Sequence, residues 1–192
     1  MTSAGLGSAR LIYTFEIMRN CTKKELSAMA EKFNKTNVMR LLDQAKVEYA
    51  YYTYDHADQF ADGVTVAQKI GKRVECVYKT LVTRGASKAF FVFVVPVAKE
   101  LDLKAAARAV GEKSIEMIRV DELTKVTGYI RGGCSPLGMK KAYRTTFDES
   151  CLAFDRILVS AGRRGVQIEL SPQELIRLAG AETAPIAMQQ EG

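Results

Sequence analysis

At residues 76–95 the chain reads CVYKTLVTRGASKAFFVFVV, and this stretch decides the fold. Residues 76–83 and 89–95 are rich in β-branched and aromatic side chains, which favour strands. Between them, residues 84–88 include glycine and serine and are typical of a hairpin loop. The uninterrupted apolar run at residues 90–95 indicates a strand that is buried on both faces. The sequence therefore predicts a β-hairpin whose second strand is buried.

Helix and strand signals lie on both sides of this hairpin. Helices are expected where a capping residue precedes apolar residues at helical spacing, at Thr36 or Asn37, at Asp62 and at Asp102. Another short helix is expected at residues 121–126. A C-terminal helix is expected from the capping-box pattern at residues 171–174, with Pro172 in the first helical position, to a stop at Gly180. Further strands are expected at residues 48–54, 114–118, 155–160 and 166–170. Because helices and strands do not alternate strictly, the expected class is α+β, or mixed α/β with a largely antiparallel or mixed sheet.

The composition indicates one domain with tails. The chain has 192 residues with 47% apolar content, which is enough for one substantial core. Residues 1–32 open with a stretch of Gly, Ser and Ala and lack sustained periodicity. We therefore expect an N-terminal extension at residues 1–32, a single domain at residues 33–186 and a C-terminal tail at residues 187–192. A chain that begins at Met29 should keep its fold and activity.

Charge and cysteine usage narrow the classes of partner and cofactor. Lys and Arg number 28 against 22 Asp and Glu, and the resulting charge of +6 is compatible with nucleic-acid binding, although many unrelated soluble proteins share it. Four cysteines without a Cys-x-x-Cys pair, and a single histidine, argue against a metal site and a disulfide framework. No segment has the pattern of a membrane span or a signal peptide. The sequence predicts a soluble cytoplasmic protein that uses no metal and no membrane.

Two segments combine apolar residues with groups that can bind an anion. Lys79 shares a strand face with Val77 and Leu81, so it either covers apolar surface at a sheet edge or lies at the rim of a pocket. Residues 128–138 hold four glycines around a Ser-Pro pair, which is typical of an ordinary loop or of backbone N–H groups that approach a ligand. This block lacks the Gly-Lys-Ser/Thr ending of an ATP-binding loop and the G-x-S-x-G pattern of serine esterases. The sequence therefore disfavours both activities.

Other polar residues near these segments also have two interpretations. A nucleophilic Cys134 would need His56 as its base, and we interpret Cys134 as a packing residue and His56 as a loop residue. Clusters of basic residues are either solvated turns or parts of a surface that binds an RNA backbone. The clusters are Lys140, Lys141 and Arg144 after the glycine-rich block, and Arg163 and Arg164 between the last two predicted strands.

Six short motifs follow one another between about Thr36 and Pro185. They are Thr53-Tyr54-Asp55-His56, Tyr78-Lys79-Thr80-Leu81, Leu101-Asp102-Leu103-Lys104, Val126-Thr127-Gly128-Tyr129, Gly-Gly-x-Ser-Pro-Leu-Gly-x-Lys-Lys from Gly132, and Val-Ser-x-Gly-x-Arg-Gly from Val159. In this order they resemble the YbaK/EbsC family of aminoacyl-tRNA editing proteins. The YbaK branch is similar to the inserted editing domain of bacterial prolyl-tRNA synthetases. Any one motif is a weak signal, whereas six in the same order are specific.

The resemblance implies a fold and an activity. The fold would be a mixed sheet curled into a barrel-like shape with helices around it. The activity would be trans-acting deacylation of Cys-tRNA(Pro), and also of Cys-tRNA(Cys), in which the thiol of the substrate cysteine attacks its own ester. Such a protein needs no cofactor and binds the aminoacyl-tRNA acceptor end, with prolyl-tRNA synthetase as a partner. Two alternatives stay open: a deacylase for another small amino acid, such as alanine on tRNA(Pro), and a noncatalytic tRNA-binding module.

The resemblance also implies roles for single residues. Lys79 would be the catalytic cation near the terminal phosphate and ribose, and Gly132 would give a backbone contact to the aminoacyl group. Phe60 would close over the ligand, at the end of a loop that is shorter than the family pattern. Ala161 stands where a glycine is frequent. The substrate-binding residues would be Tyr54, Phe60, Thr80, Gly133, Ser135, Pro136, Ser160, Gly162 and Arg164.

Overall fold

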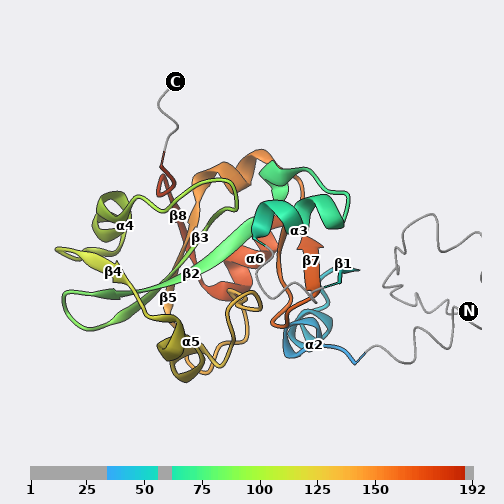
Figure 1. The fold of residues 1–192 in the computed structure, drawn as a ribbon, viewed down its shortest axis with the longest axis horizontal. Helices are drawn as coiled ribbons and strands as arrows, with labels where there is room; N and C mark the ends of the chain where they lie inside the picture. Colours follow the sequence, from blue (N-terminus) through green and yellow to red (C-terminus); the bar gives the residue numbers. More distant parts are fainter. Residues whose placement is uncertain (1–33, 56–61, 189–192) are drawn as a thin grey trace, which may run out of the picture.

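The computed structural model describes residues 34–55 and 62–188, which form two β-sheets with five α-helices around them (Figure 1). The predicted extension at residues 1–32 lies outside the described residues, as do His56, Phe60 and most of the predicted C-terminal tail. Within the described chain, no helix is long and apolar enough to cross a membrane. The predicted class, α+β with a mixed sheet, is confirmed.

The larger sheet contains the predicted hairpin and has five strands in the order β4-β2-β3-β5-β8. β2 (Tyr78–Gly85) and β3 (Phe90–Pro96) pair in antiparallel fashion, with Lys79 opposite Val95. β4 (Ile115–Met117) lies within residues 114–118, where a strand was predicted, and it pairs with the far end of β2. β5 (Arg144–Asp148) and β8 (Glu182–Ala184) extend the sheet on the other side as parallel strands, and neither was predicted from the sequence.

The smaller sheet consists of three antiparallel strands in the order β1-β7-β6. Its strands are β1 (Ala50–Thr53), β6 (Ile157–Ser160) and β7 (Val166–Leu170), which all lie at predicted positions. A parallel bridge between Val77 and Leu158 connects the two sheets. The expectation of one barrel-like sheet is therefore corrected: among the described residues, pairing between the sheets is limited to this bridge, so no barrel closes.

The helices are α2 (Asn37–Gln44), α3 (Gly63–Lys69), α4 (Leu103–Val110), α5 (Val120–Thr127) and α6 (Pro172–Ala179), with short 3₁₀ turns η2 (Val74–Cys76) and η3 (Glu149–Ala153). Capping residues begin α2, α3 and α4 where the sequence predicts them, whereas α5 follows Arg119 and has Asp121 inside its first turn. Thr36 Oγ1 accepts a hydrogen bond from Met39 N at 3.3 Å, and the carboxylates of Asp62 and Asp102 accept backbone N–H bonds in the same way. Each cap satisfies a backbone donor that the first helical turn leaves unpaired.

The C-terminal helix α6 forms as predicted, but its capping box does not. Ser171 Oγ donates to Oε1 of Gln173 at 2.6 Å. Glu174 accepts from Arg177 Nη2 at 2.5 Å. Because both polar side chains of the pattern are occupied elsewhere, neither bonds to the backbone N–H groups that a capping box satisfies. Proline at the first helical position remains as the start signal.

Alternation along β3 explains why its apolar run is buried on both faces. Phe91, Phe93 and Val95 belong to an apolar cluster with residues of α4. Val92 and Val94 belong to the main cluster, which includes residues of α2 and α6. A third cluster packs α3 over the junction of the two sheets, where the candidate site lies (Figure 1). Its buried members are Val66, Ala67, Ile70, Val77, Val97 and Leu158.

Candidate active site

A small pocket at the junction of the two sheets contains Lys79. Its volume is about 130 Å³. Both sheets, α3 and the glycine-rich loop after α5 contribute to its lining. We name it the Lys79 pocket. The predicted site residues in its lining are Tyr54, Lys79, Thr80, Gly132 and Ser160.

Lys79 lies where β2 has one side free of its own sheet. At this level β2 pairs with β3, whereas β4 reaches only residues 83–85. The Lys79 side chain is 26% exposed, and its Nζ lies 3.1 Å from Oε1 of Glu100. Glu100 is 79% exposed, and exposed ion pairs contribute about 0–1 kcal/mol, so Glu100 is a weak partner. The positive charge of Lys79 therefore lies at the pocket, where Glu100 competes only weakly with an anionic ligand.

Three polar atoms in the pocket lining lack hydrogen-bond partners. They are Thr80 Oγ1, Ser160 Oγ and Gln167 Oε1, each buried and without a partner among the described residues. Ser160 and Gln167 are opposite each other in the β6–β7 ladder, so their side chains share one face of the sheet. A buried polar group without a partner costs about 1–3 kcal/mol. Three such groups around one pocket make it the candidate site for a ligand with polar groups.

The first half of the glycine-rich loop reaches the pocket through Gly132. This residue has φ 82° and is exposed, in a left-handed conformation that glycine adopts without strain. Gly133 instead packs against the loop after β6, where a Cβ atom would lie 3.0 Å from Arg164 N. Gly133 therefore allows a close approach of two backbones and does not line the Lys79 pocket.

The second half of the loop is held away from the pocket. Ser135 is fully buried, and its Oγ accepts a hydrogen bond from Leu137 N at 3.4 Å. Tyr129 donates from its hydroxyl to Leu137 O at 2.6 Å. Pro136 lines a different cavity, of about 280 Å³, between α2 and α6. Ser135 and Pro136 thus shape the loop, and they do not contact the space beside Lys79.

The loop after β6 supports the glycine-rich loop. Arg164 Nε donates to Arg131 O at 2.6 Å, which joins the two loops. A Cβ atom on Gly132 would lie 3.5 Å from Arg164 Nε, so Arg164 borders the residue that reaches the pocket. Gly162 has φ 86°, and a Cβ atom there would lie 3.0 Å from Tyr129 Cε1. Gly162 therefore fits the loop against Tyr129, and Arg164 contributes positive charge near the pocket.

Cys134 lines the Lys79 pocket but does not have the properties of a nucleophile. Its side chain is buried, and burial raises the pKa of its thiol from an ordinary 9.0 to about 12. At neutral pH the thiol is therefore protonated, whereas the thiolate is the reactive form. Over residues 34–55 and 62–188, no group of three or more His, Cys, Asp and Glu side chains is placed to hold a metal ion. The pocket can therefore act on a ligand through the charge of Lys79, the polar groups of its lining and its shape.

The buried thiols predict a loss of stability in alkali. Burial raises the pKa of Cys134 to about 12 and that of Cys151 to about 11, from 9.0. Above pH 9 the unfolded chain loses these protons while the folded chain keeps them, so stability falls with pH by at most about 1.4 kcal/mol per unit for each thiol. Urea unfolding at pH 8 and at pH 10.5 measures this loss. Cys134→Ala/Cys151→Ala should lose less between the two pH values, and an unchanged difference would contradict the assignment.

Several residues of the Lys79 pocket were not predicted from the sequence. Gly63 and Val66 come from α3, and Gln167 comes from β7. Gln167 follows the last predicted motif by two residues, and its strand was predicted correctly. Gln167 is identified as a pocket residue by its position opposite Ser160, and this position depends on the strand register, which the sequence does not give.

Comparison with known proteins places the chain in a family. The sequence model of the aminoacyl-tRNA editing domain matches residues 58–178. EbsC of Enterococcus faecalis, named as a proposed Cys-tRNA(Pro)/Cys-tRNA(Cys) deacylase, is 42% identical over 156 residues, which cover 81% of this chain and 95% of EbsC. The solved structure of a proposed trans-editing enzyme for prolyl-tRNA synthetase has the same fold, with a TM-score of 0.69 and 23% identity over 81% of this chain and 100% of the other. A hypothetical protein of known structure gives a TM-score of 0.73 with 20% identity, over 80% and 100% of the two chains. The chain therefore belongs to the aminoacyl-tRNA editing domain family.

Proposed function

We propose that the protein is a trans-acting aminoacyl-tRNA deacylase that removes cysteine from Cys-tRNA(Pro) and from Cys-tRNA(Cys). Membership of the editing family and the 42% identity with EbsC support this activity. The observation that carries the proposal is the Lys79 pocket, in which a cation lies beside the unpartnered atoms Thr80 Oγ1, Ser160 Oγ and Gln167 Oε1. These groups suit a small ligand that carries both a phosphate and hydrogen-bond donors.

Gln167 Oε1 narrows the chemistry of that ligand. An amide oxygen only accepts hydrogen bonds, so its missing partner is a donor. The aminoacyl end of a charged tRNA supplies such a donor in its α-ammonium group. We assign this group to Gln167 and Ser160, which lie side by side, and the terminal phosphate and ribose to Lys79. In this proposal the ester carbonyl lies between them, close to the backbone of Gly132.

The reaction needs no nucleophile from the protein. The thiol sulfur of the bound cysteine attacks its own ester carbonyl carbon, forming a carbon–sulfur bond, while the bond from that carbon to the ribose oxygen breaks. The thiol proton passes to the ribose oxygen, and the products are free tRNA and a cysteine thiolactone that water opens. The protein contributes by holding thiol and carbonyl together and by stabilising negative charge on the carbonyl oxygen through Lys79 and the Gly132 backbone.

The rest of the tRNA binds outside the pocket in this proposal. Arg164, beside Gly132, and the exposed Arg131 provide positive charge for the acceptor strand. We propose prolyl-tRNA synthetase as the partner that presents the tRNA, and the cytoplasm as the place of action. We also propose residues 33–186 as the unit that folds and reacts, with residues 1–32 as a dispensable extension.

The test compares three substrates that differ only at the aminoacyl group. Cys-tRNA(Pro), Ala-tRNA(Pro) and Cys-tRNA(Pro) with its thiol alkylated are incubated with the protein, and release of the amino acid is followed. We expect release of cysteine alone, because the alkylated substrate and alanine lack the attacking thiol. Equal release of alanine would replace this mechanism with attack by water. Tight binding of all three without release would overturn the proposal in favour of a noncatalytic tRNA-binding module.

A further inference from the structure

Helix α3 spans the Lys79 pocket and rests on the larger sheet at its N-terminal end. Gly63 and Val66 of α3 line the pocket. Gly63 is packed closely against Val97, which follows β3, because a Cβ atom on Gly63 would lie 2.3 Å from Val97 Cγ1. The larger sheet therefore fixes where α3 begins.

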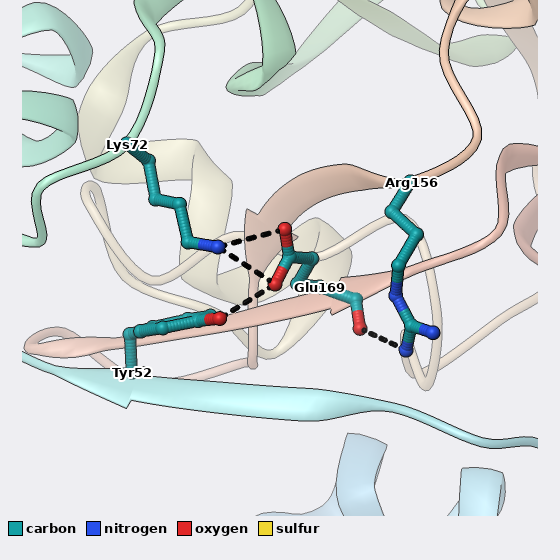
Figure 2. Close-up of polar contacts among 4 residues, drawn as sticks. All are labelled: Tyr52, Lys72, Arg156 and Glu169. Carbon is teal, nitrogen blue, oxygen red and sulfur yellow. Dashed lines mark hydrogen bonds and ion pairs between the residues drawn. The ribbon is translucent and has the colours of Figure 1, made fainter. Parts of the chain in front are cut away.

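The other end of α3 is bound to the smaller sheet by a cluster of polar side chains (Figure 2). Lys72, three residues after α3, has its Nζ 3.0 Å from both carboxylate oxygens of Glu169 in β7. Tyr52 of β1 donates from its hydroxyl to Glu169 Oε2 at 2.6 Å, and Lys72 Nζ lies 4.6 Å from the centre of the Tyr52 ring. Lys72 and Glu169 are 28% and 15% exposed, so this ion pair is shielded from water more than the others near the pocket. We name Tyr52, Lys72 and Glu169 the Glu169 cluster.

The Glu169 cluster continues the surface that forms the pocket. Glu169 is two residues from Gln167 in β7, so the two side chains lie on one face of the strand, and Tyr52 of β1 is opposite Gln167. Val66 of α3 and Ile70, the C-cap of α3, belong to one apolar cluster with Leu158 of β6. Lys72 therefore connects the C-terminal end of α3 to the strand that carries Gln167, and Lys69 of α3 adds a hydrogen bond to Asp55 O.

We infer that the Glu169 cluster is a positioning device for the reaction: it holds α3 across the pocket and fixes the wall made by Gly63 and Val66 against Gln167 and Tyr54. This role rests on the proposed deacylase function. Charge-assisted hydrogen bonds with both partners half-buried are stronger than exposed pairs, and removal of one partner leaves the other charge without compensation. The cluster does not touch the substrate, and it acts through α3.

Glu169→Gln and Lys72→Met test this role, with Glu174→Gln as a matched control. The control removes one charge from the exposed Glu174–Arg177 pair on α6. Hydrogen exchange is followed at Val66 N in α3, at Ile70 N in its C-cap, which donates to Val66 O, and at Ala106 N in α4. We expect α3 amides to lose at least about tenfold in protection while α4 is unchanged, because the opening is local. Equal loss in both helices, or no loss in α3, overturns the inference.

Kinetics give the second readout on the same proteins. With Cys-tRNA(Pro), kcat should fall about fivefold while KM stays within about twofold, because the wall that orients thiol and carbonyl shifts and the phosphate contacts remain. Tyr52→Phe removes a single hydrogen bond and should give a smaller change in the same direction. The exchanged pair Lys72→Glu/Glu169→Lys should restore both protection and kcat, and failure to restore either is evidence against a positioning role. If the wild-type protein releases no amino acid, the proposed function fails, while the exchange data still decide the role of the cluster.

Discussion

Lys79→Ala is expected to lower release of cysteine from Cys-tRNA(Pro) by at least about 100-fold, with the fold unchanged. Lys79 is the one lysine in the lining of the Lys79 pocket. A fixed positive charge at the site where negative charge develops contributes more than the same charge in water, because it needs no reorganisation during the reaction. No other cation of the described chain lines this pocket, and the nearby Arg164 donates from its Nε to Arg131 O.

The fold should tolerate this substitution. The Lys79 side chain is 26% exposed, and its ion pair with Glu100 contributes little to stability. Thermal unfolding of Lys79→Ala should therefore match the wild type within a few degrees. Lys104→Ala is the control, because Lys104 is an exposed lysine in the first turn of α4 and does not line the pocket. Full activity of Lys79→Ala, or an equal loss in Lys104→Ala, would falsify the role given to Lys79.

The elements that could be predicted are those set by local signals. The hairpin follows from its β-branched and aromatic residues, and α2, α3 and α4 follow from Thr36, Asp62 and Asp102, whose caps are all seen. The capping box of α6 was wrong because Ser171 and Glu174 found other side-chain partners. Local sequence shows which groups are available for a cap, but not which competing partner they bind.

The missed strands depend on contacts that are distant in sequence. β5 pairs with β3 across about fifty residues, and β8 has three residues that pair with β5 alone. Asp148, at the end of β5, accepts hydrogen bonds from Ile186 N and Ala187 N at 3.0 and 2.8 Å, which holds the chain after β8 in place. The hydrophobic pattern within these short segments does not predict such pairing. The separation into two sheets was missed for the same reason, since it depends on where pairing stops.

In the candidate site, too, some residues could be predicted from local motifs and others depend on contacts between distant segments. The resemblance of motifs implied Lys79, Thr80, Gly132, Tyr54 and Ser160, and the structure brings all five to one pocket. Gly133, Ser135, Pro136 and Gly162 lie in the same motifs but shape the loops, and Phe60 lies outside the described residues. A motif groups residues by their nearness in sequence, whereas a pocket is lined by residues that the fold brings together from different elements.

Thr80→Val and Thr83→Val should have the same effect on stability but different effects on activity. Both threonines lie on β2, and each has an Oγ1 without a hydrogen-bond partner among the described residues. Valine has nearly the same shape and removes the unpaired hydroxyl, so each variant should gain about 1 kcal/mol, or about 2–4 °C in Tm. Thr80 lines the Lys79 pocket and Thr83 does not.

The pair therefore separates the cost of an unpaired hydroxyl from its use. If Thr80 Oγ1 is kept without a partner so that it can bond the charged end of the substrate, Thr80→Val should lose about 10- to 100-fold in kcat/KM, because such a bond is worth about 1.5–3 kcal/mol. Thr83→Val should keep its activity. Tm and kcat/KM for Cys-tRNA(Pro), measured on both variants, test this directly. Equal activity in the two variants would mean that the unpaired oxygen at Thr80 has no ligand to satisfy it, and the assignment of the Lys79 pocket as the substrate site would lose its main support.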